Sequence, residues 1–274
     1  IRKNINHKMR MKDRYIITVN SITLYVIAFL LTTIVHELAH AFAGLLYNGE
    51  PVLHHNYVEH LTDHLSIRQQ VIIALAGPIA SLIQGIIAGI VYFKSKRRGL
   101  IELFILWFFI LGMFNFLGYL MTGPMFQSGD IGKVHLLLNI PLLIQILLAC
   151  VGAAILLIVA YKLTTPFLEF SYEEAWTNSI KSRKSFSFHI LIMPWIIGSM
   201  LVTVLYLPIV AIVSIIYPFM SGMVLIFPWQ NAARIENIVS SNNKSIGQIS
   251  AVSLFILGAL IIVFRFFLLP GIKI

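Results

Sequence analysis

Long apolar runs separated by short polar segments dominate the chain. A run of about 20 apolar residues can cross the hydrocarbon core of a bilayer as a helix, because a helix satisfies its own backbone polar groups. The pattern predicts six such helices, over residues 15–47, 67–93, 100–122, 134–162, 186–217 and 248–268. We therefore expect an all-α, polytopic membrane protein whose main solvent is the lipid bilayer.

The polar segments between the apolar runs set the expected organisation. The predicted division is a basic tail (1–14), a core (15–162), a polar connection (163–185) and additional membrane helices (186–274). The connection carries Glu169, Glu173, Glu174 and Trp176, a composition compatible with an interfacial helix. Residues 229–247 indicate an exposed turn, and no second soluble domain is expected.

Composition agrees with this class of protein. Hydrophobic residues make up 58% of the chain and charged residues 11%, whereas an average soluble domain is about 45 to 50% apolar and about 25% charged. The single cysteine, Cys150, excludes an intrachain disulfide and a zinc cluster built from cysteines.

The net charge of the chain is +9. The basic residues are concentrated in particular loops and not on one face of a soluble domain. If the loops alternate between the two sides, one side receives every lysine and arginine except Arg68, Lys133, Arg234 and Lys244. Because basic residues concentrate in cytoplasmic loops, we expect a multi-pass protein of the cell membrane with both termini in the cytoplasm. Topology explains the charge without a nucleic-acid partner.

The first apolar run contains the sequence His36-Glu37-Leu38-Ala39-His40. Histidines at positions i and i+4 of a helix share one face and lie about 5 to 6 Å apart, so both can bind one metal ion. This spacing is the HExxH pattern of zinc proteases, in which the glutamate is the general base. We therefore predict that His36 and His40 bind Zn²⁺ and that Glu37 is catalytic.

The position of the motif inside a spanning helix favours function over packing. A charged side chain at the centre of such a helix costs about 2.5 to 3.5 kcal/mol on insertion scales, and ionisable residues there mark functional sites by default. The alternative is that His36, Glu37 and His40 only form hydrogen bonds between helices.

A catalytic zinc ion keeps three protein ligands and one open position, so a third ligand is needed. Asp130 follows the third predicted span in a loop rich in glycine, and this span ends at the same side of the membrane as the histidines. We predict Asp130 as the third ligand. The alternatives are that Asp130 only caps the next helix, or that His135 or Asp63 is the ligand.

These residues resemble the site-2 proteases, whose core pairs HExxH on one transmembrane helix with an aspartate at the start of a later one. Residues 75–81, Leu-Ala-Gly-Pro-Ile-Ala-Ser, are similar to the Ala-Gly-Pro segment of that family. Asp130-Ile131-Gly132 replaces the family's Asp-Gly dipeptide. The stripe formed by Gly77, Ser81, Gly85 and Gly89 predicts close approach of another helix.

The resemblance implies a three-helix metalloprotease core plus three further helices. It implies a zinc-dependent intramembrane endopeptidase that hydrolyses peptide bonds within or next to a membrane-spanning segment of its substrate. His36, His40 and Asp130 would hold Zn²⁺, and Glu37 would act as the base. The rival hypothesis is a metal-binding membrane scaffold or transporter without proteolytic activity.

Two further features leave alternatives open. The loop around residues 54–64 is rich in histidine (His54, His55, His60 and His64, with Glu59 and Asp63). It is either a merely polar loop or one that delivers zinc, senses pH or borders the substrate. Asn115, an amide in an apolar run, either bonds between helices or binds the substrate or an oxyanion.

Overall fold

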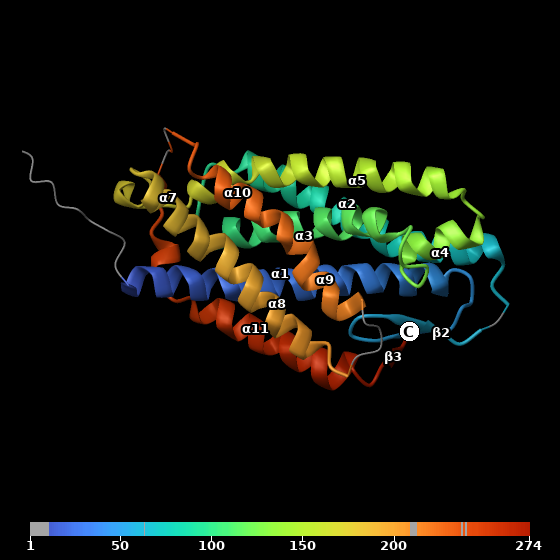
Figure 1. Ribbon diagram of the computed structural model, residues 1–274. Coiled ribbons are helices and arrows are strands. Elements are labelled where there is room, and N and C mark those ends of the chain that lie inside the picture. The colour runs from blue at the N-terminus through green and yellow to red at the C-terminus, as the bar shows by residue number, and fades with distance from the viewer. Residues whose placement is uncertain (1–10, 63, 209–212, 237, 239) are drawn as a thin grey trace, which may run out of the picture.

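The computed structural model describes residues 11–274 apart from 63, 209–212, 237 and 239 (Figure 1). Within this part, six helical segments are long and apolar enough to span a membrane, which confirms the prediction of a multi-pass, mostly helical protein. They are Met11–Leu45, Ile67–Lys94, Leu100–Thr122, Leu142–Leu168, Ile180–Leu205 and Ala251–Leu268. Residues 11–14 of the predicted tail are therefore helical.

Helices α1 (Met11–Leu45), α2 (Ile67–Lys94) and α3 (Leu100–Thr122) pack against one another. In the most apolar stretch of α1, 83% of the residues are buried, the largest share among the six segments, so the helix with the HExxH motif lies at the centre. A Cβ built at Gly112 of α3 would lie 2.7 Å from the Ser81 carbonyl oxygen and 2.8 Å from the Gly85 nitrogen. The small-residue stripe of α2 therefore allows the close approach that was predicted.

The fourth predicted span, 134–162, is divided in the structure. Helix α4 covers Asp130–Leu137, and the spanning helix α5 covers Leu142–Lys162. Between them, Asn139 has a φ of 49° and Pro141 is the N-cap of α5. Asparagine tolerates this left-handed conformation, and the residue before a proline disfavours helix, so the chain breaks here.

The polar connection contains α6 (Thr164–Leu168), the 3₁₀ turn η1 (Glu174–Trp176) and the beginning of α7 (Ile180–Ser187). Trp176 is 1% exposed, so it belongs to the core and not to a helix lying flat on the membrane. The buried Arg183 donates hydrogen bonds to the carbonyls of Thr177 and Ala232, both at 3.0 Å.

The fifth pass is shorter than the predicted 186–217 at its C-terminal end. It consists of α7, the π-helical turn η2 (Phe188–Ile192) and α8 (Met193–Leu205). The chain then returns along α8 as α9 (Val213–Gly222), η3 (Met223–Leu225) and α10 (Ile226–Asn231).

Two tryptophans show that this return runs antiparallel to the fifth pass. The indole of Trp195 donates to the Phe219 carbonyl (3.2 Å), and that of Trp229 donates to the Lys184 carbonyl (3.1 Å). The residue order is thus reversed between the two segments. Residues 213–231 form an additional pass in short pieces, two of which contain prolines, and a search for uninterrupted apolar runs misses it.

The last helix, α11 (Ala251–Ile262), follows the 3₁₀ turn η4 (Ser245–Gly247) and continues as the π-helical turn η5 (Val263–Leu268). It leads to a small sheet of order β2-β1-β3 that an all-α fold does not include. The antiparallel strands are β1 (Pro51–Leu53), β2 (Val58–His60) and β3 (Ile272–Lys273). The fold is therefore mostly helical with one small sheet.

The sheet also corrects the predicted position of the C-terminal end. Strand β3 pairs with β1, which follows the end of α1, so β3 lies opposite the start of α1 (Figure 1). The sequence analysis expected both termini on one side of the membrane, whereas β3 and the start of α1 lie at opposite ends of the bundle, because residues 213–231 add a further helical segment between α8 and α11. We call the end of the bundle with the strands the sheet end.

Most of the described lysines and arginines lie at the opposite end, where α1 begins, which we call the basic end. They are Lys12, Arg14, Lys94, Lys96, Arg97, Arg98, Lys162, Lys181, Arg183, Lys184, Arg234 and Lys244. The sheet end carries Arg68, Lys133, Arg265 and Lys273. The additional pass thus moves Arg234 and Lys244 to the basic end, and Arg265 and Lys273 to the sheet end.

Candidate metal centre

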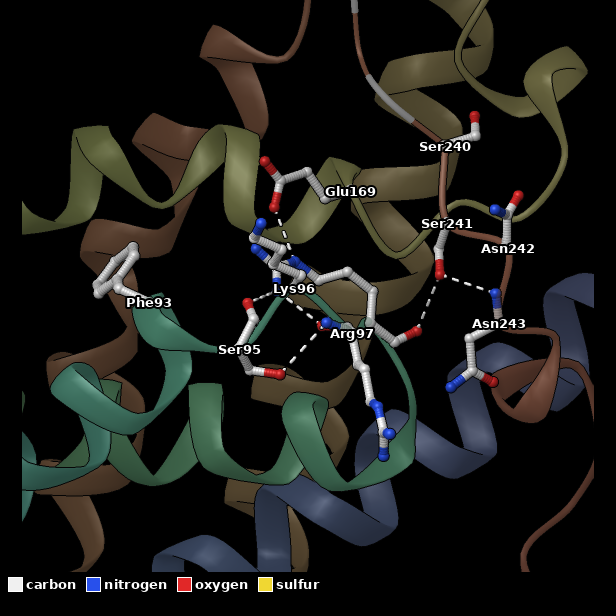
Figure 2. Close-up of a pocket in the computed structure, with 10 residues that line it drawn as sticks. Phe93, Ser95, Lys96, Arg97, Glu169, Ser240, Ser241, Asn242 and Asn243 are labelled. Carbon is white, nitrogen blue, oxygen red and sulfur yellow. Dashed lines mark hydrogen bonds and ion pairs between the residues drawn. The ribbon is translucent and has the colours of Figure 1, made fainter.

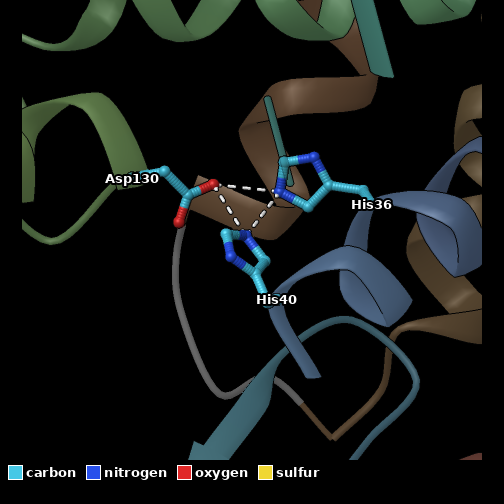
Figure 3. A group of neighbouring side chains, drawn as sticks. All are labelled: His36, His40 and Asp130. Atoms are coloured by element: carbon cyan, nitrogen blue, oxygen red, sulfur yellow. Dashed lines mark hydrogen bonds and ion pairs between the residues drawn. The ribbon is translucent and has the colours of Figure 1, made fainter. Parts of the chain in front are cut away.

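Three side chains that can bind metal converge between α1 and α4 (Figure 3). The Nε2 atoms of His36 and His40 are 3.1 Å apart, and Asp130 Oδ2 lies 2.9 Å from the first and 3.3 Å from the second. The two histidines come from successive turns of α1, and Asp130 lies in the first turn of α4. The structure therefore brings together the three residues predicted as ligands.

Hydrogen bonds on the far side of each ring orient the two imidazoles. The Nδ1 of His36 lies 3.1 Å from the Ser81 hydroxyl, and the Nδ1 of His40 donates to the Ile73 carbonyl at 2.7 Å. Such bonds fix the tautomer that leaves Nε2 free to accept a metal ion. Helix α2 therefore holds both rings with Nε2 directed at Asp130.

Gly77 provides the space that the rings occupy. A Cβ built at this position would lie 2.7 Å from His36 Nε2 and would collide with His40 Nε2. Sequence reasoning assigned Gly77 and Ser81 to helix packing alone, but they also face the histidines. In the sequence, the recurrence of small residues every four positions from Gly77 indicated a close contact on this face of α2. It did not show that Gly77 and Ser81 contact the histidines.

The donor set fits a zinc ion. Ligand atoms placed about 2.0 to 2.2 Å from a tetrahedral zinc lie about 3.3 to 3.6 Å from one another, so the separations of 2.9 to 3.3 Å found here need to widen by at most about 0.7 Å. His36 and His40 are 3% and 7% exposed, so the nitrogens are protected from water. Asp130 lies at the N-terminal end of α4, where a negative charge is favoured.

A cavity of about 320 Å³ adjoins His36, one of the three side chains. It lies between α1, α3 and α9, and His36 and Glu37 both line it. Glu37 is 8% exposed. The ring of Tyr119, also in the lining, stacks on His36 with 5.3 Å between ring centroids. A carboxylate that can accept a proton thus lies beside the three side chains and faces a space for a ligand.

Asn115 belongs to the same cavity. Its side chain is 8% exposed, and its Oδ1 atom is buried without a hydrogen-bond partner among the described residues. A buried amide group without a partner is costly unless a ligand or water satisfies it. The Asn115 side chain also forms a hydrogen bond with the side chain of Tyr217 in α9. The amide therefore bonds between helices, as one alternative predicted, while its Oδ1 atom is left for a ligand or water to satisfy.

The other histidines lie outside this group. His135 is buried on α4 against Gly123, and Asp63, the other fallback ligand, lies outside the described residues. His54 stacks on Tyr57, and His55 lies with Nε2 3.3 Å from the Tyr206 carbonyl. No second set of three metal-binding side chains occurs in the described part of the chain.

Two histidines of the sheet end are partly withdrawn from water. Burial is the main cause that lowers the pKa of His55, and the charges of His54 and Arg265 lower it further. Burial also lowers the pKa of His60, which packs against Gly44 and Gly49. Both rings are therefore neutral at neutral pH, whereas His64 is exposed.

Comparison of the chain with protein-family models, with curated proteins and with solved structures finds no match.

Proposed function

We propose that this protein is a zinc-dependent intramembrane endopeptidase similar to the site-2 proteases. One observation carries the proposal: His36 and His40 of α1 meet Asp130 of α4 next to Glu37, at a cavity within the membrane-spanning part. Three ligands leave one coordination position open, as catalysis requires and a closed structural site does not.

The residues have distinct roles in the proposed hydrolysis. A Zn²⁺ ion held by His36, His40 and Asp130 would act as a Lewis acid towards the scissile carbonyl and would acidify a water molecule. Glu37 takes a proton from the attacking water as the new carbon–oxygen bond forms. It then gives this proton to the amine nitrogen as the carbon–nitrogen bond breaks.

The cavity supports a membrane-spanning substrate in an unwound conformation. Its lining is largely apolar, with Phe114, Met121 and Leu156 among the contributing side chains. A helical segment has its carbonyls already hydrogen-bonded, so it must unwind before water can attack. Asn115, with its unpaired buried oxygen, would then satisfy an N–H group of the extended segment. Because α3 and α9 both line the cavity, a substrate would pass between the earlier and later spans.

The charge distribution supports one orientation in the cell membrane. The basic end would face the cytoplasm, because lysine and arginine concentrate in cytoplasmic loops. Since the HExxH motif lies in the last turns of α1, near the sheet end, the metal centre would lie in the extracytoplasmic half of the bilayer. The N-terminal side would be cytoplasmic and the C-terminal strand extracytoplasmic.

The test compares the wild type with Glu37→Gln, purified in detergent, for bound zinc and for cleavage of a library of single-span peptides. We expect both proteins to bind about one zinc ion, and the variant to cleave about 10²- to 10⁴-fold more slowly because it lacks the base. Zinc binding with no cleavage by either protein, combined with zinc flux or client binding in vesicles, would favour the rival scaffold or transporter.

A further inference from the structure

A second cavity lies at the basic end, at the opposite end of α2 from the metal centre (Figure 2). Its volume is about 540 Å³. The turn between α2 and α3 forms one wall, with Ser95, Lys96 and Arg97, and residues 240–243 form another. The cavity plays no part in the proposed hydrolysis.

The charges in this cavity do not cancel. Arg98 donates to the Glu169 carboxylate at 2.7 Å and to the Ser95 carbonyl at 2.8 Å, and its guanidinium lies over the Tyr92 ring. The only carboxylate in the lining is thus paired with Arg98. Lys96 and Arg97 are exposed, and neither side chain forms an ion pair or hydrogen bond with the described residues. The cavity therefore presents two unpaired cations.

Neutral polar groups accompany these cations. The Ser240 hydroxyl is buried and has no hydrogen-bond partner in the part of the chain that the structure describes. The amide of Asn242 is exposed in the same wall. Hydroxyl and amide donors in a cavity that is also lined by a lysine and an arginine are suited to an oxyanion such as phosphate, which accepts several hydrogen bonds.

The surface next to the cavity is apolar and faces lipid. Phe93, which lines the cavity, is 62% exposed, and Ile90 and Ile86 on the preceding turns are 50% and 47% exposed. These side chains lie on a spanning helix, so they contact acyl chains. A ligand seated here would meet cations at one end and hydrocarbon at the other.

We propose that this cavity binds the phosphate headgroup of an anionic phospholipid, with the acyl chains lying along Ile86, Ile90 and Phe93. Basic pockets at the cytoplasmic membrane surface are suited to such lipids, because anionic lipids are concentrated there. The proposal rests on the contacts at the basic end and does not require the protein to be a protease.

The experiment uses the full chain, freed of lipid in detergent and titrated with phosphatidylglycerol or phosphatidylcholine. Bound lipid is counted by native mass spectrometry. The test variant is Lys96→Ala/Arg97→Ala, and the matched control is Lys162→Ala/Lys181→Ala. The control removes two exposed cations from the same end but outside the cavity. Melting temperature and bound zinc, measured on every variant, show that the fold is retained.

We expect the wild type and the control to retain phosphatidylglycerol in preference to phosphatidylcholine. The test variant should bind phosphatidylglycerol about 30-fold more weakly, because two cationic contacts to the headgroup are lost. Equal weakening in the control would overturn the proposal, since general surface charge would then account for binding. No preference between the two lipids in the wild type would also overturn it.

A separate arm distinguishes a lipid from a soluble phosphate compound. Inorganic phosphate and glycerol phosphate are added to the protein with phosphatidylglycerol bound. We expect neither to displace the lipid at millimolar concentration, because neither carries acyl chains for the face of α2. Displacement by the soluble compounds at the affinity of the lipid itself would assign the cavity to a soluble anion and overturn the lipid assignment.

Discussion

Ionisable side chains are buried near the sheet end of the bundle, whereas at the basic end several are exposed. Towards the sheet end, His36, Glu37 and His40 are buried on the central helix, and their neighbour Asp130 completes a compact group. At the basic end, Lys96 and Arg97 are exposed, and the ion pair between Arg98 and Glu169 lies at the rim of a cavity.

This difference separates two uses of ionisable residues in a membrane protein. Removing a charge from water is costly, so buried ionisable groups persist where they act together on a ligand or a metal ion. Exposed cations cost little, and they orient the chain and attract anionic lipids. Substitutions near the metal centre should therefore change metal binding and activity, whereas those at the basic end should not.

The largest effect is expected from Asp130→Ala, which removes the only proposed ligand outside α1. Bound zinc should fall from about one ion per chain to background, and cleavage should fall at least as far as in Glu37→Gln, about 10²- to 10⁴-fold. Metal analysis and peptide cleavage measure both effects. Glu59→Gln removes an exposed carboxylate from the sheet end and should retain zinc. Full zinc in Asp130→Ala would exclude this residue as a ligand.

The next effect is expected from Gly77→Ala. The added methyl group would displace the two Nε2 atoms, and misplacement of reacting groups by about 1 Å can reduce a rate about 10²-fold. The control is Gly258→Ala, where a Cβ has no neighbour within 4 Å. Reduced zinc affinity at an unchanged melting temperature would separate ligand displacement from loss of the fold. Normal zinc binding and activity in Gly77→Ala would contradict the geometry of the site.

Ser81→Ala tests the hydrogen bond behind His36. Loss of a partner that orients a metal ligand reduces metal affinity or activity by about 10- to 100-fold. Competition with a zinc chelator measures the affinity. Ser253→Ala, which removes a hydroxyl that hydrogen-bonds to Ser250 at the N-cap of α11, is the control. Equal zinc affinities for the two variants would show that the Ser81 hydroxyl does not support His36.

The smallest effect is expected from Glu169→Gln at the basic end. The pair with Arg98 is partly exposed, so its loss should cost about 1 kcal/mol or less in the free energy of unfolding. Zinc content and cleavage should equal those of the wild type. Thermal unfolding and the peptide assay check both statements. A large loss of activity in Glu169→Gln would contradict the prediction that substitutions at the basic end leave the metal centre unaffected.

The features that the sequence predicts correctly are those encoded by residues close together in the chain. The apolar runs required six spanning helices because exposed backbone polar groups are excluded from hydrocarbon. The spacing of His36 and His40 placed both on one face of a helix, and the glycine-rich loop before Asp130 allowed that carboxylate to reach the same depth. Each of these inferences depends on residues that are close together in the chain.

The errors arose where distant segments decide the structure. Short helices interrupted by Pro218 and Pro228 hide the pass over residues 213–231, which packs against α8. An additional segment changes the end of the bundle at which every later loop lies, so β3 lies at the sheet end and not beside the start of α1. The strands are only two or three residues long, and pairing between residues 52 and 273 has no local signature.

The sequence by itself determined that the chain has helices suited to span a membrane. It also determined that one of these helices carries His36 and His40 on one face, with Glu37 beside the first histidine. Hydrophobic length and helical periodicity are properties of contiguous residues, so no partner is needed to establish them. Only the tertiary structure decided that Asp130 meets these histidines, that Ser81 and Ile73 orient their rings, and that Gly77 leaves room for them. These contacts join α1, α2 and α4, and their geometry depends on how the helices pack at a scale of one atom.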